Sequence, residues 1–94
     1  MRARTLTLTP RLDATAATPL LNALLTKRGA SLDLRVDQVE RIATSSLQVL
    51  LSAAATWRAD GHRLRLIGGS EVLDEAVRTL GLTLDNLTAE GATG

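Results

Sequence analysis

Two hydrophobic patterns alternate along the chain. Every second position is apolar in residues 4–9, 31–36 and 63–67, which is the period of a half-buried β-strand. In residues 20–25, 47–57 and 73–80 the apolar positions instead follow the three-or-four-residue spacing of an amphipathic helix. Strands that alternate with helices predict an α/β domain with a mostly parallel sheet.

The predicted strands are apolar on one side only. Leu32, Leu34 and Val36 share one face of their strand, whereas Asp33 and Arg35 share the other. A parallel sheet that is buried on both sides has strands that are apolar throughout. We therefore expect a sheet of about four strands with helices packed mainly on one face. The other face is then polar and open, or covered by a second copy of the chain in a homodimer.

The longest predicted helix begins at a hydroxyl triplet, Thr44-Ser45-Ser46, and ends before Gly61. Its apolar stripe is predicted to be mostly buried, with Trp57 in or at the edge of the core. Its solvent-visible chemistry is therefore expected at its first turn and in the preceding loop. One interpretation of the triplet is purely structural, because Ser and Thr oxygens accept hydrogen bonds from the unpartnered amides of a first helical turn.

Shorter sequence patterns predict the remaining caps, turns and the C-terminal segment. Asp13, Thr15 or Thr18 is expected to cap the first helix. Gly68-Gly69-Ser70 is expected to form a tight turn before the third helix, and His62 is expected to face solvent. Residues 82–87 fit a short strand or a turn of helix, and residues 88–94 are expected to be frayed.

Composition excludes several function classes. The chain has 94 residues, enough for one small domain over residues 1–94. It has no Cys and one His, which excludes disulfides, thiolate chemistry and multi-His zinc sites, and no cofactor is predicted. A formal net charge of +1 gives no electrostatic argument for binding nucleic acid or an anionic membrane. Without a membrane-length apolar run or a secretory signal, the sequence predicts a cytoplasmic protein.

The segment from Val39 to Leu51, Val-Glu-Arg-Ile-Ala-Thr-Ser-Ser-Leu-Gln-Val-Leu-Leu, resembles the signature of STAS domains, the fold of bacterial anti-sigma-factor antagonists. In that family a strand leads to Ile-Asp-Ser-Ser-Gly-Leu, where a helix begins. The segment Gly61–Ile67, the helix from about Ser70 and the closing Thr79–Leu82 also match the usual ending of the family. The resemblance covers roughly residues 31–82.

The resemblance implies a phosphorylation site. In the family the second serine of Asp-Ser-Ser-Gly accepts a phosphoryl group from a partner kinase, and this position corresponds to Ser45. Thr44 and Ser46 are alternative acceptors. Ala43 and Ser46 stand where the family has its aspartate and glycine, so the domain could also bind its partner without being a good kinase substrate.

The resemblance also implies a non-catalytic interaction module. The expected partner is a histidine-kinase-like anti-sigma factor or a chemotaxis-type kinase assembly, and the alternative is an accessory subunit of a larger assembly such as a lipid-transport ABC complex. No general base, metal-ligand set or nucleophile relay is apparent, so we do not expect an enzyme. The predicted partner-binding residues are Asp37, Gln38, Glu40, Arg41, Thr44, Ser45, Ser46 and Gln48.

Overall fold

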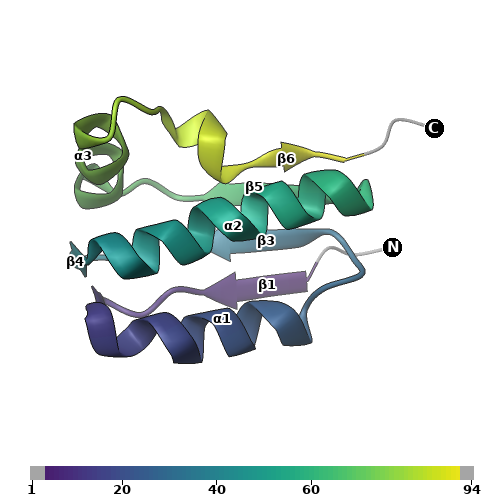
Figure 1. The fold of residues 1–94 in the computed structure, drawn as a ribbon, viewed down its shortest axis with the longest axis horizontal. Helices are drawn as coiled ribbons and strands as arrows, with labels where there is room; N and C mark the ends of the chain where they lie inside the picture. Colours follow the sequence, from purple (N-terminus) through teal and green to yellow (C-terminus); the bar gives the residue numbers. More distant parts are fainter. Residues whose placement is uncertain (1–3, 92–94) are drawn as a thin grey trace.

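The computed structural model describes residues 4–91 and shows three α-helices and a four-stranded sheet in that range (Figure 1). The helices are α1 (Ala17–Thr26), α2 (Thr44–Asp60) and α3 (Glu71–Thr79). The strands of the sheet are β1 (Arg4–Thr7), β3 (Leu32–Arg35), β5 (Arg63–Ile67) and β6 (Ala89–Glu90), and β2 (Arg11–Leu12) and β4 (Arg41–Ile42) form a separate two-stranded ribbon. Residues 4–91 also contain two 3-10 helices, η1 (Ala14–Ala16) and η2 (Leu84–Leu87).

The sheet is mostly parallel, as the sequence predicts. Its strand order is β1-β3-β5-β6, and only the β5–β6 pair is antiparallel. The register places Leu6 beside Leu34 and Leu34 beside Leu66. One face of the sheet is therefore leucine-rich along its central strands.

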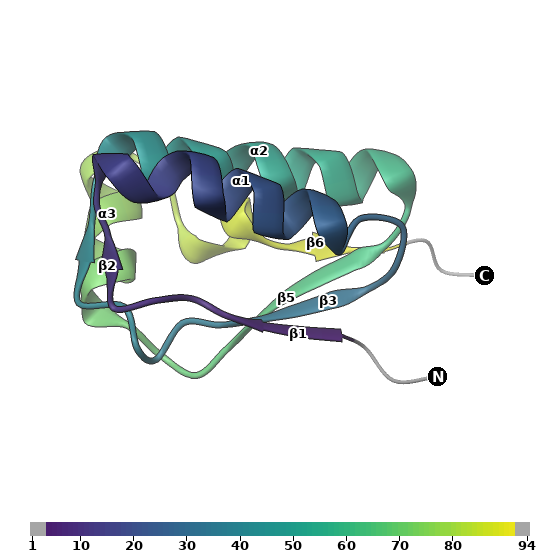
Figure 2. The same cartoon turned by 90° about the horizontal axis from the view of Figure 1, so that it is seen from below.

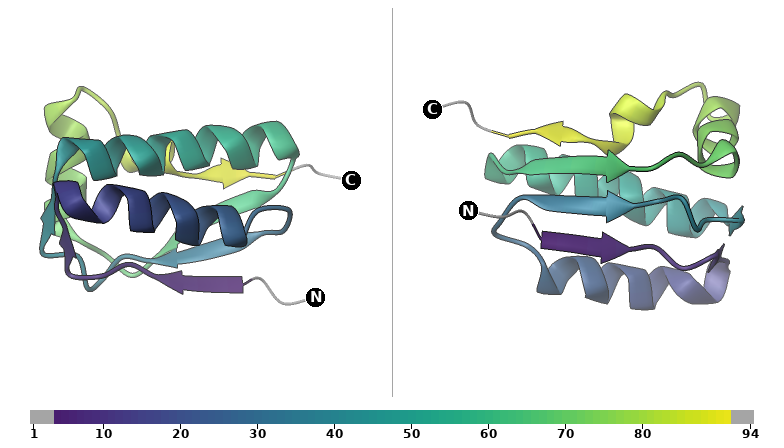
Figure 3. Two further views of the ribbon diagram at one scale, coloured as in Figure 1. Left: turned by 60° about the horizontal axis from the view of Figure 1, so that its bottom comes forward. Right: turned by 180° about the vertical axis from the view of Figure 1, so that it is seen from behind.

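The helices cover this leucine-rich face. α1 and α2 lie side by side over the sheet, and α3 packs at the end of the domain where β4 lies (Figures 1 and 2). In the view from behind, the central strands lie in front of the helices, with nothing covering them (right panel of Figure 3). The one-sided arrangement predicted from the alternating strands is confirmed.

The core lies between the sheet and α2. Leu50, Ala54 and Trp57 on α2 are buried together with Leu34 and Leu64 of the sheet. The indole Nε1–H of Trp57 donates a hydrogen bond of 2.8 Å to the carbonyl of Ala30, so its polar atom is satisfied inside the core. The predicted core position of Trp57 is thus confirmed.

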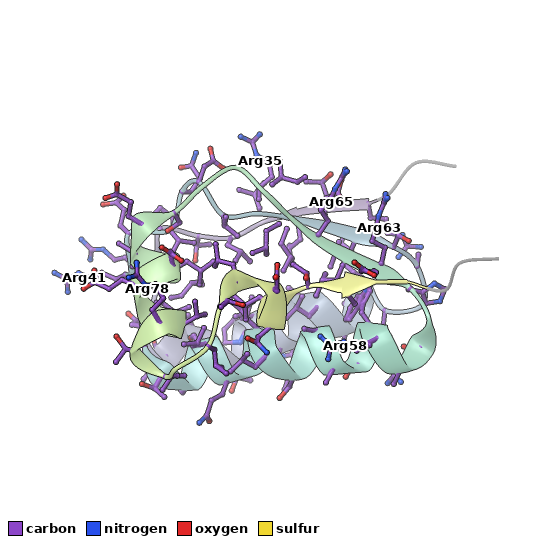
Figure 4. All side chains as sticks on the ribbon, turned by 90° about the horizontal axis from the view of Figure 1, so that it is seen from above. Arg35, Arg41, Arg58, Arg63, Arg65 and Arg78 are labelled. Atoms are coloured by element: carbon purple, nitrogen blue, oxygen red, sulfur yellow. The ribbon has the colours of Figure 1, made fainter. Side chains whose placement is uncertain are left out.

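The uncovered sheet face carries charged side chains that pair with one another. Asp33 and Arg65 are direct cross-strand partners, and their side chains form two hydrogen bonds of 3.2 and 3.0 Å. Arg35 pairs with Asp37 at 3.1 Å. Figure 4 shows Arg35, Arg63 and Arg65 on the side of the sheet away from α2.

The C-terminal part matches one prediction and contradicts another. Residues 82–87 were expected to hold a short strand or a turn of helix, and the 3-10 helix Leu84–Leu87 confirms the helical alternative. The fourth strand comes later, at Ala89–Glu90, where Ala89 is buried and pairs with Leu64. The expectation of a frayed tail is therefore wrong for residues 88–91, and residues 92–94 lie outside the described range. The hydrophobic effect explains the difference, because Leu87 and Ala89 both bury their side chains in the core.

Leu50→Ala tests the assignment of the core. We expect the variant to lose about 2–5 kcal/mol of unfolding free energy, because the deletion leaves a cavity at a position that is 1% exposed. Leu25→Ala is the matched control, since Leu25 is 51% exposed and surface substitutions usually change stability by about 0.5 kcal/mol or less. Urea titration monitored by Trp57 fluorescence measures both, and equal losses would contradict the assignment.

Candidate functional site

The candidate site lies at the end of the domain where the parallel strands finish. β1, β3 and β5 all point to this end, which also holds the β2–β4 ribbon and the first turn of α2 (Figure 1). The carboxyl edge of a parallel sheet collects the loops that follow each strand, and binding sites commonly occur there. The fold therefore brings the predicted loop, residues 37–41, next to the hydroxyl triplet.

Backbone hydrogen bonds hold this loop in place. The Pro10 carbonyl accepts hydrogen bonds from the amides of Glu40 and Arg41, at 2.8 and 3.0 Å. The Ala43 amide then donates to the Leu12 carbonyl at 2.7 Å. These three bonds run along the β2–β4 ribbon and fix the chain up to the residue that precedes α2.

A second turn supports the loop from the other side. The Ser70 hydroxyl caps α3 by accepting from the Leu73 amide at 3.1 Å, and the same hydroxyl donates to the Val39 carbonyl at 3.2 Å. Gly68 has φ +80°, and a Cβ there would come within 2.9 Å of the Asp37 Cβ. The position therefore requires glycine, and residues 68–70 form a bend that leads from β5 into the N-cap of α3.

The first turn of α2 has no side-chain cap. Its N-cap residue is Ala43, in extended conformation, and the turn contains no acidic residue. Within residues 4–91, no backbone amide donates a hydrogen bond to the hydroxyl of Thr44, Ser45 or Ser46. The interpretation of the triplet as a helix cap is therefore wrong, and the partial positive charge of the helix N-terminus is not offset by a side chain of this turn.

The three hydroxyls of the triplet lie in two different environments. Thr44 and Ser45 are exposed, whereas Ser46 is 0% exposed. The Ser46 Oγ–H donates to the backbone carbonyl of Asp13 at 2.9 Å. The prediction of Ser46 as a partner contact and as an alternative phosphate acceptor is therefore wrong, because neither a partner nor a kinase can reach a buried hydroxyl.

The other predicted contact residues are accessible. We call this set the rim: Asp37, Gln38, Glu40, Arg41, Thr44, Ser45 and Gln48, all of them exposed. Asp37 is the only rim residue in an ion pair among those found for residues 4–91. Sequence reasoning missed Arg11, which the ribbon places directly beside Arg41, because two-residue strands leave no periodic pattern in the sequence.

The remaining features concern His62, metal binding and membrane-spanning helices. His62 was expected to face solvent and is half-buried in the turn after α2. Residues 4–91 contain no group of three His, Cys, Asp or Glu side chains arranged to hold a metal ion. None of the helices within that range is both long enough and apolar enough to cross a membrane.

Asp13 links the site to the start of α1. Its carboxylate caps η1, and the Thr15 hydroxyl, 2.6 Å from Oδ1, does most to hold the pKa of Asp13 below its ordinary value. Hydrogen bonds from the amides of Ala16 and Thr15, and the charge of Arg11, lower this pKa further against partial desolvation. The residue whose carbonyl anchors Ser46 is thus itself held by its side chain.

Fold and site together define a small α/β domain that presents a polar rim at the start of its central helix. The family model described as "Mlab, STAS domain" matches residues 2–88 of the 94-residue chain, and the chain belongs to the STAS domain family. Comparison with curated proteins and with solved structures gave no match. STAS domains are generally non-catalytic modules that mediate protein–protein interactions.

A charge placed at Ser45 and the same charge placed at Ser46 should have opposite effects. Ser45→Asp is expected to raise the unfolding free energy by about 0.3–1 kcal/mol, because it brings a negative charge to an uncapped helix N-terminus. Ser46→Asp is expected to cost about 3 kcal/mol or more, because it buries a charge without a partner. Urea unfolding measures both, and similar values for the two variants would contradict the assigned environments.

The lowered pKa of Asp13 predicts a specific acid sensitivity. A carboxyl group whose pKa is lower in the folded state stabilises the fold above its ordinary pKa of about 3.9, and the stabilisation is lost as the pH falls through the folded value. We expect the urea midpoint of Asp13→Asn to fall less steeply than that of the wild type between pH 5 and pH 2. Thr15→Val, which removes the largest cause of the shift, should show part of the same effect. Parallel curves for all three proteins would contradict the prediction.

Proposed function

We propose that this STAS domain is a docking module in bacterial signalling, and that a protein partner binds its rim. The observation that carries the proposal is the contrast within the first turn of α2. Thr44 and Ser45 present their hydroxyls to solvent, whereas Ser46 is anchored inside. The turn is thus held in one position while two small polar side chains remain available to a partner.

The surroundings of the two hydroxyls support binding rather than catalysis. A serine or threonine nucleophile requires a neighbouring general base within hydrogen-bond reach. Within residues 4–91, neither Thr44 nor Ser45 hydrogen-bonds to a histidine or a carboxylate. This supports a role in recognition, in line with the general behaviour of the family.

We further propose that phosphorylation of Ser45 switches this binding. A phosphate adds about −1.5 to −2 charges at neutral pH. The uncapped N-terminus of α2 stabilises such a group, so the domain stays folded. A docked partner would meet new charge and bulk at the centre of its contact. The proposed partner is a histidine-kinase-like anti-sigma factor or a chemotaxis-type kinase assembly, which would also supply the phosphoryl group.

A second candidate function is docking without modification, as an accessory subunit of a larger assembly such as a lipid-transport ABC complex. The observation that favours it is the local environment of Ser45. Ala43 supplies no carboxylate beside the hydroxyl, where the phosphorylated relatives that the motif resembles have an aspartate, and Ser46 fills their glycine position with a buried side chain. In this alternative the rim binds constitutively.

Capture from the native host with a tagged chain tests the proposal. Wild type and Ser45→Ala are expected to retain the same kinase-type partner, and Ser45→Asp is expected to lose most of it. Ser52→Asp is the matched control, because Ser52 is exposed on the same helix but lies about two turns away from Ser45. Equal capture by all four proteins would remove Ser45 from the mechanism.

Mass spectrometry separates the two candidates. Trypsin cleaves after Arg41 and Arg58, so residues 42–58 form one peptide that contains the whole triplet. A phosphate on Ser45 together with a kinase-type partner supports the switch. An unmodified peptide, with an ABC-type ATPase captured equally by wild type and Ser45→Ala, supports the accessory-subunit role and contradicts the switch.

A further inference from the structure

Two arginines lie side by side on the outer face of the β2–β4 ribbon. The parallel register pairs Arg11 with Arg41 and Leu12 with Ile42. Both arginines are exposed, whereas Leu12 is buried and Ile42 is half-buried. The ribbon therefore directs its apolar pair inwards and its two positive charges outwards together.

Four arginines, Arg28, Arg35, Arg65 and Arg78, each have a carboxylate partner within 3.6 Å. None of the ion pairs found in residues 4–91 includes Arg11 or Arg41, and the same holds for Arg4, Arg58 and Arg63. What sets Arg11 and Arg41 apart within this range is that they face each other as cross-strand partners. The charge of Arg11 contributes to lowering the pKa of the nearby Asp13, but the two side chains form none of the ion pairs found in residues 4–91, and the Asp13 carboxylate hydrogen-bonds to Thr15 and Ala16 instead.

The arrangement is unfavourable for the isolated domain. Two like charges on neighbouring strands repel each other, and because both arginines are exposed this repulsion is weak and screened by salt. An anionic group placed against both guanidinium groups removes this repulsion and adds charge-assisted hydrogen bonds. Since neither arginine is in an ion pair found within residues 4–91, the juxtaposition of Arg11 and Arg41 points to an anion from outside the domain that contacts both guanidinium groups.

We infer that Arg11 and Arg41 bind carboxylates of an acidic segment on the protein that docks at the rim. Arg41 belongs to the rim and is two residues from the N-cap of α2. Figure 4 shows Arg41 pointing outwards at the end of the molecule. The inference rests on the proposed docking function and adds the chemistry of the partner, which must present aspartate or glutamate side chains opposite the ribbon.

Titration of the 15N-labelled domain with a hexaglutamate peptide at low salt tests this inference directly. We expect amide shifts centred on residues 11–12 and 40–43. Arg11→Gln/Arg41→Gln is expected to raise the Kd about three-fold or more, since one exposed charge pair contributes about two- to five-fold in affinity at most. Arg4→Gln/Arg63→Gln is the matched control. It removes the same number of charges from residues that begin β1 and β5, at the opposite end of the strands, and should leave the Kd within about two-fold.

Several outcomes of this titration would overturn the inference that Arg11 and Arg41 bind carboxylates. Shifts spread evenly over the surface, or equal losses in the two double variants, would overturn the inference, because they would show unspecific attraction to net charge. Binding of inorganic phosphate at the ribbon without binding of hexaglutamate would overturn the carboxylate assignment. A lower urea midpoint for Arg11→Gln/Arg41→Gln would also overturn it, since the arginines would then stabilise the fold.

The same variants separate this inference from the proposed function. If the host partner is lost with Ser45→Asp but kept by Arg11→Gln/Arg41→Gln, rim docking stands and the arginine inference fails. If hexaglutamate binds at the ribbon and Ser45→Asp captures its partner normally, the ribbon binds acidic segments and the proposed switch fails.

Discussion

The position of α2 depends on its attachment to the segment between β1 and α1. The buried Ser46 hydroxyl reaches back to the Asp13 carbonyl, and the Ala43 amide reaches the Leu12 carbonyl. These bonds fix the position of the first helical turn along the helix axis and its orientation about that axis. Because successive helical residues are about 100° apart, a helix that turns Ser46 inwards must turn Thr44 and Ser45 towards other directions. Ser46 and the following Leu47 both lie on the inner side of the helix, and Thr44 and Ser45 lie on the exposed side.

This arrangement separates the groups that hold the fold from the groups available for recognition. Leu47, Leu50 and Trp57 bury the inner side of α2 against the core, and their contribution does not depend on the chemistry of the exposed first turn. The amides of that turn have no side-chain cap, so a negative charge at Ser45 meets a favourable field. A domain built in this way can change the charge of its surface without losing its core, which is the physical requirement for a binding switch.

The sequence predicted the larger elements because their patterns are long. Period-two runs identified β1, β3 and β5, and the apolar stripe of α2 placed Trp57 in the core. The β2–β4 ribbon was missed because Arg11-Leu12 and Arg41-Ile42 are too short to show a period. The burial of Ser46 was missed for a different reason. Its hydroxyl is satisfied by a carbonyl 33 residues earlier in the chain, and such a long-range contact leaves no local signal.

The two charged surfaces of the domain are organised differently, and this bears on where a partner can bind. On the open sheet face, Asp33 is only 14% exposed beneath its pairing with Arg65. A second copy that covered this face would have to desolvate a pair that is already satisfied, and burying a satisfied ion pair gives little or no net gain. At the ribbon, the charges of Arg11 and Arg41 repel each other, so an acidic partner gains their attraction without first breaking an internal pair. The satisfied Asp33–Arg65 pair thus argues against docking over that part of the sheet face, and the Arg11–Arg41 juxtaposition supports the proposed docking at the rim.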